Sequence, residues 1–141
     1  MRFVWPEAVE RVASFLRASG LEGRLEELLA GAHAPPGLQL VATAFECEGR
    51  LVVALVPAGL TLDRRKLAGV AACSELVTAE RPEFPFASAT VLLEQTALTA
   101  PTVWLEVGTP RHVLGLAPAQ LTRLARAQTA DLTVERQKGG G

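Results

Sequence analysis

The stretch from Leu38 to Val56 limits the possible folds of this chain most strongly, because it reads as a β-hairpin. In its first half Phe45 and the other odd-numbered residues would face one side of a strand, and Ala42 and the other even-numbered residues the opposite side. Gly49 can adopt the positive φ that a tight turn requires. The return run, residues 51–56, is apolar throughout, and such a strand is normally covered on both faces. We therefore expect it near the centre of a sheet.

The other elements follow from periodicity and turn residues. Helical spacing of apolar residues predicts helices over Glu7–Ala18, over Arg64–Ala72 and from Pro118 onward. Strands are expected at residues 76–78, 91–93, 102–107 and 112–116, with a short turn or helical turn at 94–100. The run 79–86 contains two prolines, which remove backbone donors, so it is predicted to be a loop. Strands interleaved with helices and joined by hairpins indicate an α+β fold with a mixed sheet.

A chain of 141 residues fits one domain, which we expect to span residues 1–133, with residues 134–141 as a flexible tail. The apolar fraction of 49% and charged fraction of 21% are typical of soluble globular proteins. No apolar run approaches the ~20 residues of a membrane-spanning helix, and the first residues lack the pattern of a secretory signal. We therefore expect a cytoplasmic protein with no membrane partner.

Few residues suggest metal or nucleophile chemistry. His33 and His112 are far apart and belong to no metal-binding motif, so no metal or cofactor is expected. Cys47 and Cys73 lack zinc-ligand spacing and are predicted to be free thiols, as is usual in the cytosol. The net charge of −1 attracts no nucleic acid globally, so RNA contact would need a local patch. Such patches are Arg64–Lys66 and Arg123 with Arg126, although most runs of this kind are solvated helix faces.

The run from Val41 to Pro57, followed by Asp-Arg-Arg-Lys-Leu, is similar to the centre of the YbaK/ProX group of aminoacyl-tRNA editing domains. Residues 91–94 resemble an apolar strand of these domains that ends in an acidic residue. Residues 102–108 resemble the next strand and its glycine turn, and residues 116–121 resemble a Leu-Ser-Pro-Ala-Asp-Leu helix start. The resemblance covers nearly the whole chain and implies a curved mixed sheet with helices packed on it.

The resemblance also implies a strand within Leu21–Ala30, where local spacing favours a helix. Leucines recur there at helical intervals among strong helix formers. We expect a helix over Leu25–Ala30.

The site implied by the resemblance lies between the central strand, the proline-bearing loop and the glycine turn. Its expected substrate-binding residues are Ala42, Thr43, Phe45, Phe84, Pro85, Phe86 and Gly108; no catalytic residue is assigned. Five positions depart from the family pattern. Ala42 replaces a lysine, and Glu83-Phe84 replaces glycines of the loop. Glu106 precedes the glycine turn where some members have a serine, and Val113 replaces an acidic residue of the following strand. Alternatively, the two loop phenylalanines simply cover the sheet edge.

The resemblance implies two functional hypotheses. In the first, the chain is a trans-editing deacylase that hydrolyses a small amino acid such as cysteine or alanine from mischarged tRNA, with the tRNA for proline as one candidate. Its partners would be the aminoacyl-tRNA 3′ end and an aminoacyl-tRNA synthetase. Such chemistry requires an oxyanion site and a water rather than an obvious protein base. In the second, a module of the same fold binds an aminoacyl-adenosine, tRNA or synthetase and cleaves nothing.

Overall fold

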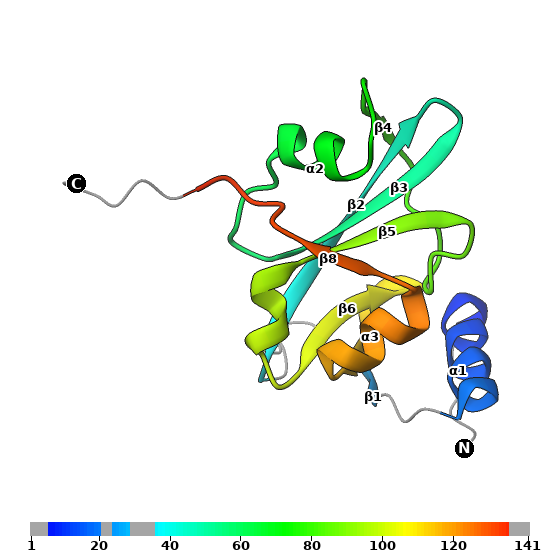
Figure 1. Ribbon diagram of the computed structural model, residues 1–141. Helices are drawn as coiled ribbons and strands as arrows, with labels where there is room; N and C mark the ends of the chain where they lie inside the picture. Colours follow the sequence, from blue (N-terminus) through cyan, green and yellow to red (C-terminus); the bar gives the residue numbers. More distant parts are fainter. Residues whose placement is uncertain (1–5, 21–23, 29–35, 136–141) are drawn as a thin grey trace, which may run out of the picture.

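The computed structural model describes residues 6–20, 24–28 and 36–135 (Figure 1). Its elements follow the predicted order except at residues 24–27 and 128–130, which form strands that were not predicted from local patterns. The bounds of the helices and strands are α1 Glu7–Ser19, β1 Arg24–Glu27, β2 Leu38–Cys47, β3 Arg50–Pro57, α2 Arg64–Val70, β4 Val77–Ala79, β5 Ala89–Glu94, the 3-10 helix η1 Gln95–Thr99, β6 Val103–Val107, β7 Thr109–Leu116, α3 Pro118–Ala125 and β8 Gln128–Ala130. Within the described residues, no helix is long and apolar enough to span a membrane. Residues 136–141 of the predicted tail, and His33, lie outside the described residues.

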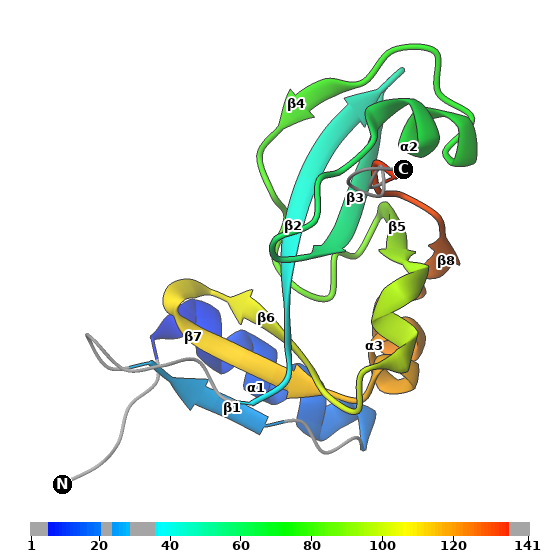
Figure 2. The same ribbon diagram turned by 90° about the vertical axis from the view of Figure 1, so that its left-hand side faces the viewer.

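The described strands form one eight-stranded mixed sheet, which confirms the predicted α+β class. Its order is β1-β7-β6-β2-β3-β5-β8, with β4 pairing on β2. β2 pairs antiparallel with β3 and parallel with β6, whereas β5 runs parallel to both β3 and β8. Figure 2 shows β2 running from the part of the sheet formed by β1, β7 and β6 to the part formed by β3, β4 and β5. The sheet is therefore curved, and β2 belongs to both parts.

The core lies on both faces of the central strands, as the apolar run of β3 predicted. Val53 and Leu55 pack in a larger cluster with β6, β7 and α1, while Val52 and Ala54 pack in a second cluster that includes Phe45 of β2 and Leu67 of α2. Each of these β3 residues is fully buried. Side chains that alternate along a strand enter opposite clusters.

The predicted helix over Leu25–Ala30 is wrong where the structure describes it. Arg24–Glu27 forms the edge strand β1, whose residue Leu25 pairs with Leu114 of β7. Leu25 packs against the larger core cluster. Its apolar side chain is therefore partly buried in the strand, as it would also have been in a helix that packed on the core. Tertiary pairing overrides local propensity in short segments, and the strand implied by the family resemblance is the correct reading. Residues 29 and 30 lie outside the described part of the chain.

The prediction of free thiols is also wrong, because Cys47 and Cys73 form a disulfide. Cys47 ends β2 and Cys73 follows α2, and the packing of α2 on the sheet brings their Cα atoms to 5.9 Å. That separation lies within the range that a disulfide spans. Spacing along the chain could exclude a zinc motif but could not reveal this tertiary proximity. The bond ties α2 to the central hairpin.

Candidate functional site

A small cavity lies where β2, the loop after β4 and the turn between β6 and β7 meet. Its volume is about 160 Å³. We name it the Ala42 pocket; its lining residues are Ala42, Arg81, Pro82, Glu83, Phe84, Phe86, Glu106, Gly108, Thr109 and Pro110. Cavities for drug-sized ligands usually measure roughly 300–1,000 Å³. The Ala42 pocket therefore suits a small chemical group.

The expected site residues are only partly brought together. Ala42, Phe84, Phe86 and Gly108 line the Ala42 pocket. Pro85 lines a neighbouring hollow instead. Thr43 and Phe45 are on the opposite face of β2 from Ala42, because side chains alternate along a strand. The Phe45 side chain packs in the second core cluster, and the Arg64 guanidinium lies 4.9 Å from the centre of the Phe45 ring.

The strand edge at Ala42 is open towards the pocket. Glu48 and Gly49 both have positive φ, 52° and 81°, as in a type I′ turn, so Cys47 and Arg50 form the hydrogen-bonded pair that closes the hairpin. Hydrogen-bonded and non-hydrogen-bonded pairs alternate in an antiparallel ladder, and the N–H and C=O groups of Ala42 therefore face away from β3. On that side β4 pairs with residues 44–46 and β6 with residues 38 and 39, and no strand within the described ranges pairs with Ala42 there. The N–H and C=O groups of Ala42 are therefore positioned to bind a ligand.

The wall formed by the loop is packed rather than open. The Phe84 ring lies at a steep angle to the rings of Phe86 and of Phe15 in α1, with ring centres 5.7 Å and 6.1 Å away. Both loop phenylalanines belong to the larger core cluster, and the Phe84–Pro85 peptide bond is cis. Side chains in this position hold the loop in place and leave an apolar surface towards the pocket.

The charged groups of the pocket come from both of its walls. An Arg81 Nη atom lies 3.8 Å from a carboxylate oxygen of Glu106, and both side chains are about half exposed, at 48%. Glu83 is bound by the Arg11 guanidinium through Nε at 3.0 Å and through a second, shorter contact. The hydrogen bond from Arg11 holds the pKa of the Glu83 carboxyl below its usual range. Glu83 is thus neutralised by α1, whereas Arg81 and Glu106 are loosely paired and free to exchange partners.

The Thr109 hydroxyl, at the edge of the Ala42 pocket, contacts the His112 imidazole. The Thr109 Oγ lies 2.6 Å from Nδ1 of His112 and accepts a hydrogen bond from the Arg111 N–H at 3.2 Å. His112 is only 5% exposed and lies on β7, so the contact fixes the position of the Thr109 hydroxyl beside the cavity. Gly108 precedes it with a φ of 76°, and a Cβ there would lie 2.9 Å from Val9 of α1. The turn thus combines a positive φ with close contact to the helix.

Three solved structures share this arrangement of elements. A scaffold protein made by computational backbone grafting for epitope presentation aligns with a TM-score of 0.80 and 23% identity, over 94% of this chain and all of its own. The structure described as "a putative trans-editing enzyme for prolyl tRNA synthetase" aligns at 0.79 and 24%, with the same coverage. Hypothetical protein APE2540 aligns at 0.70 and 15%, over 88% of this chain and 99% of that one. The chain has a YbaK/ProX-like fold. No family model matches the sequence, and no curated protein matches it either.

Within this YbaK/ProX-like fold, Ala42 stands where the family resemblance implies a lysine, and the cation at the pocket comes from elsewhere. Arg81 also lines an adjoining cavity of about 60 Å³ together with Ala42 and Glu106. The basic run Arg64–Lys66 is occupied away from the pocket: Arg64 donates to the Leu76 carbonyl at 2.7 Å, and Lys66 binds Asp131 at 2.9 Å. Sequence analysis missed Arg81. The available signal was its place directly before Pro82 in the site loop.

Proposed function

We propose that this chain is a trans-editing aminoacyl-tRNA deacylase that hydrolyses the ester between a small amino acid, such as cysteine or alanine, and the 3′ end of tRNA. The tRNA for proline is the first candidate carrier. The observation that carries the proposal is the Ala42 pocket: a small cavity beside an open strand edge, with one guanidinium and one fixed hydroxyl, in a fold shared with a protein described as a trans-editing enzyme. The proposal includes a cytoplasmic location and contact with an aminoacyl-tRNA synthetase.

Each wall of the pocket supports one part of the reaction. The apolar surface of Ala42, Phe84 and Phe86 suits the amino-acid side chain, and the volume of about 160 Å³ excludes a large one. The Glu106 carboxylate suits the α-ammonium group of the ester. Arg81, once released from Glu106, suits the phosphate of the terminal nucleotide, because a guanidinium binds phosphate with several donors.

The chemical step needs a water and a stabilised oxyanion. The Ala42 N–H can donate to the ester carbonyl oxygen as negative charge develops on it, and the Thr109 hydroxyl can orient the attacking water. Water adds to the carbonyl carbon, and the bond between the acyl carbon and the ribose oxygen breaks. The products are the free amino acid and a tRNA whose terminal hydroxyl has regained its proton.

One observation favours the alternative of a binding module without hydrolysis. Phe84 is 6% exposed and packs into the core, in the loop where the family resemblance implies glycines whose N–H groups face the ester. A phenylalanine in place of a glycine narrows the approach of an ester to the backbone N–H groups of this loop. Such a module would bind the aminoacyl end and protect it.

The experiment measures binding and deacylation of cysteinyl- and alanyl-tRNA at two salt concentrations. We expect Arg81→Gln to weaken binding about tenfold and to reduce its salt dependence, since a hydrogen bond to a charged group contributes about 1.5 kcal/mol. Ala42→Lys in the Arg81→Gln background should restore both properties. Arg65→Gln is the matched control, because it removes the same charge from α2.

The outcomes separate the hypotheses. Deacylation above the spontaneous rate that falls in Arg81→Gln supports the enzyme. Tight binding with no acceleration supports the binding module. Brisk hydrolysis that neither Arg81→Gln nor Ala42→Lys changes would mean that the reaction takes place elsewhere on the molecule.

A further inference from the structure

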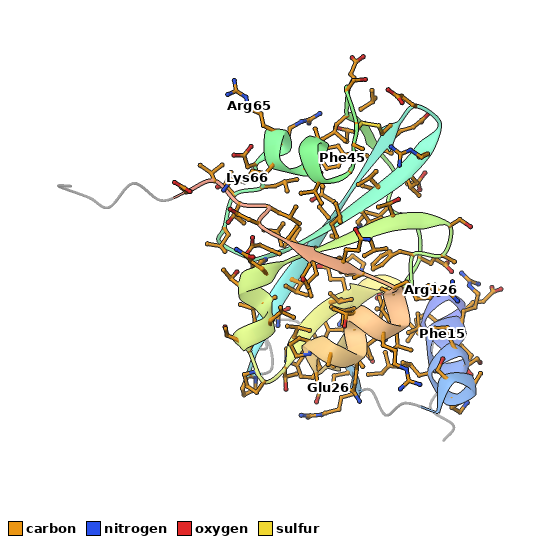
Figure 3. The ribbon with its side chains drawn as sticks, in the orientation of Figure 1. Phe15, Glu26, Phe45, Arg65, Lys66 and Arg126 are labelled. Carbon is orange, nitrogen blue, oxygen red and sulfur yellow. A yellow bond between two sulfur atoms is a disulfide. The ribbon has the colours of Figure 1, made fainter. Side chains whose placement is uncertain are left out.

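A second hollow lies on the other side of the site loop, between α1 and the end of α3. Its volume is about 560 Å³. We name it the Arg126 pocket; its lining includes Phe15, Phe86, Ser88, Arg123, Leu124 and Arg126. Figure 3 shows Arg126 beside Phe15, and α1 and α3 lie next to each other in Figure 1. The lining thus combines three partly or fully buried apolar side chains, Phe15, Phe86 and Leu124, with two exposed arginines. We call the apolar side chains the floor of the hollow and the two arginines its rim.

The guanidinium groups of this rim are not neutralised within the described part of the chain. Arg123 and Arg126 are exposed and have no carboxylate within 4.0 Å among the described residues. Other cations do pair: Arg11 with Glu83, Arg17 with Glu10 and Lys66 with Asp131 are examples. Of the residues that the structure describes, no acidic one lines the Arg126 pocket, whereas the Ala42 pocket has Glu83 and Glu106. The rim therefore attracts anions.

Stabilisation of the helix explains only part of this arrangement. Arg123 lies in the last turn of α3, where a cation offsets the helix dipole. Arg126 follows the helix as its C-cap, with a left-handed backbone, and shares the same hollow. A helix end needs no apolar cavity beside its cations, and the floor formed by Phe15 and Leu124 has no role in that explanation.

We propose that the Arg126 pocket binds a nucleotide of single-stranded RNA, with the phosphate held by Arg123 and Arg126 and the base lying over Phe15 and Leu124. Cationic grooves with aromatic side chains are typical of proteins that bind single strands. Phe86 lines both hollows, so the two hollows adjoin. In this proposal the 3′ end of the strand enters the Ala42 pocket and a preceding nucleotide binds in the Arg126 pocket. The inference extends the proposed function to the RNA that carries the ester, but RNA binding does not require that the ester be cleaved.

The test measures binding of a fluorescent, unacylated single-stranded RNA ending in CCA, by anisotropy at several salt concentrations. For single strands the slope of log K against log salt changes by about 0.7 for each phosphate contact. Arg123→Gln with Arg126→Gln should therefore reduce the slope by about 0.7, because both guanidinium groups hold the same phosphate, and should weaken binding at least about tenfold. The same double change to lysine should keep most of the slope. Arg65→Gln, at the opposite end of the molecule in Figure 3, should leave it unchanged.

Three results would overturn the inference. The slope of the double glutamine variant could equal that of the wild type, Arg65→Gln could reduce the slope as much as Arg126→Gln, or millimolar inorganic phosphate could displace the RNA completely, which would indicate a small-anion site. A melting temperature measured for each variant separates lost binding from lost folding.

Hydrolysis of an aminoacyl-adenosine without phosphates distinguishes this inference from the proposed function. The double glutamine variant should hydrolyse it as the wild type does. If no variant hydrolyses it while the RNA slopes behave as expected, the deacylase proposal fails and the RNA site stands.

Discussion

The Cys47–Cys73 disulfide leads to a prediction whose size follows from the loop that it closes. The sequence separation is 26 residues. For a loop of this length, the chain-entropy relation gives a stabilisation of about 3.5 kcal/mol at 25 °C, because the cross-link restricts the unfolded chain. Unfolding entropy is about 2.1 cal/mol/K per residue, or about 0.3 kcal/mol/K for 141 residues. Loss of the bond should therefore lower the melting temperature by about 12 °C.

The assay compares the wild type refolded with and without reductant, followed by circular dichroism during heating. Reduction leaves both side chains in place, so the comparison isolates the cross-link from the packing of the sulfur atoms. Cys47→Ala with Cys73→Ala is the control, and its melting temperature should not respond to reductant. The reasoning would be refuted if the denatured, unreduced wild type showed two titratable thiols and its melting temperature were the same with and without reductant.

Three further predictions concern buried groups. Burial opposes ionisation of Glu94, but hydrogen bonds, including one from the Leu132 N–H at 2.9 Å, hold its pKa below the usual range. The stability that the ionised Glu94 contributes should be full above about pH 4.3, the pKa in the unfolded chain, and should be lost as the pH falls through the lower pKa of the folded state. The free energy of unfolding of Glu94→Gln, measured in urea, should therefore depend less on pH in this range than that of the wild type. Equal pH dependence would contradict this. Phe45 is 2% exposed, and Phe45→Ala should reduce the free energy of unfolding by about 3–5 kcal/mol; an unchanged urea midpoint would place the ring at the surface. A Cβ at Gly115 would lie 2.7 Å from the Trp104 ring, so Gly115→Ala should cost about 1–3 kcal/mol, and a wild-type midpoint would show that the ring can shift freely.

Part of the Ala42 pocket could be predicted from the sequence, because the family resemblance assigns positions along the chain. It led to Ala42, Phe84, Phe86 and Gly108, which the structure brings to one cavity. It also led to Phe45, which alternation along β2 directs into the second core cluster. Arg81 was missed, since its role depends on where a loop folds over the strand. Local sequence patterns do not indicate which distant segments, such as this loop and β2, come into contact in the folded chain.

The sequence by itself determined those helices and strands whose buried face is evident from the pattern of a few neighbouring residues. The apolar run of β3, the positive-φ position at Gly49 and the apolar stripe of α1 each depend on neighbours within a few residues, and each element appears as expected. The tertiary structure alone decided that β1 is a strand, since Leu25 gains its burial and its backbone partners from β7. It also decided the partner of Cys47 and the short parallel strand β8, because these depend on contacts between segments far apart in the chain. Local propensity is worth a few tenths of a kcal/mol per residue, and long-range burial is worth more.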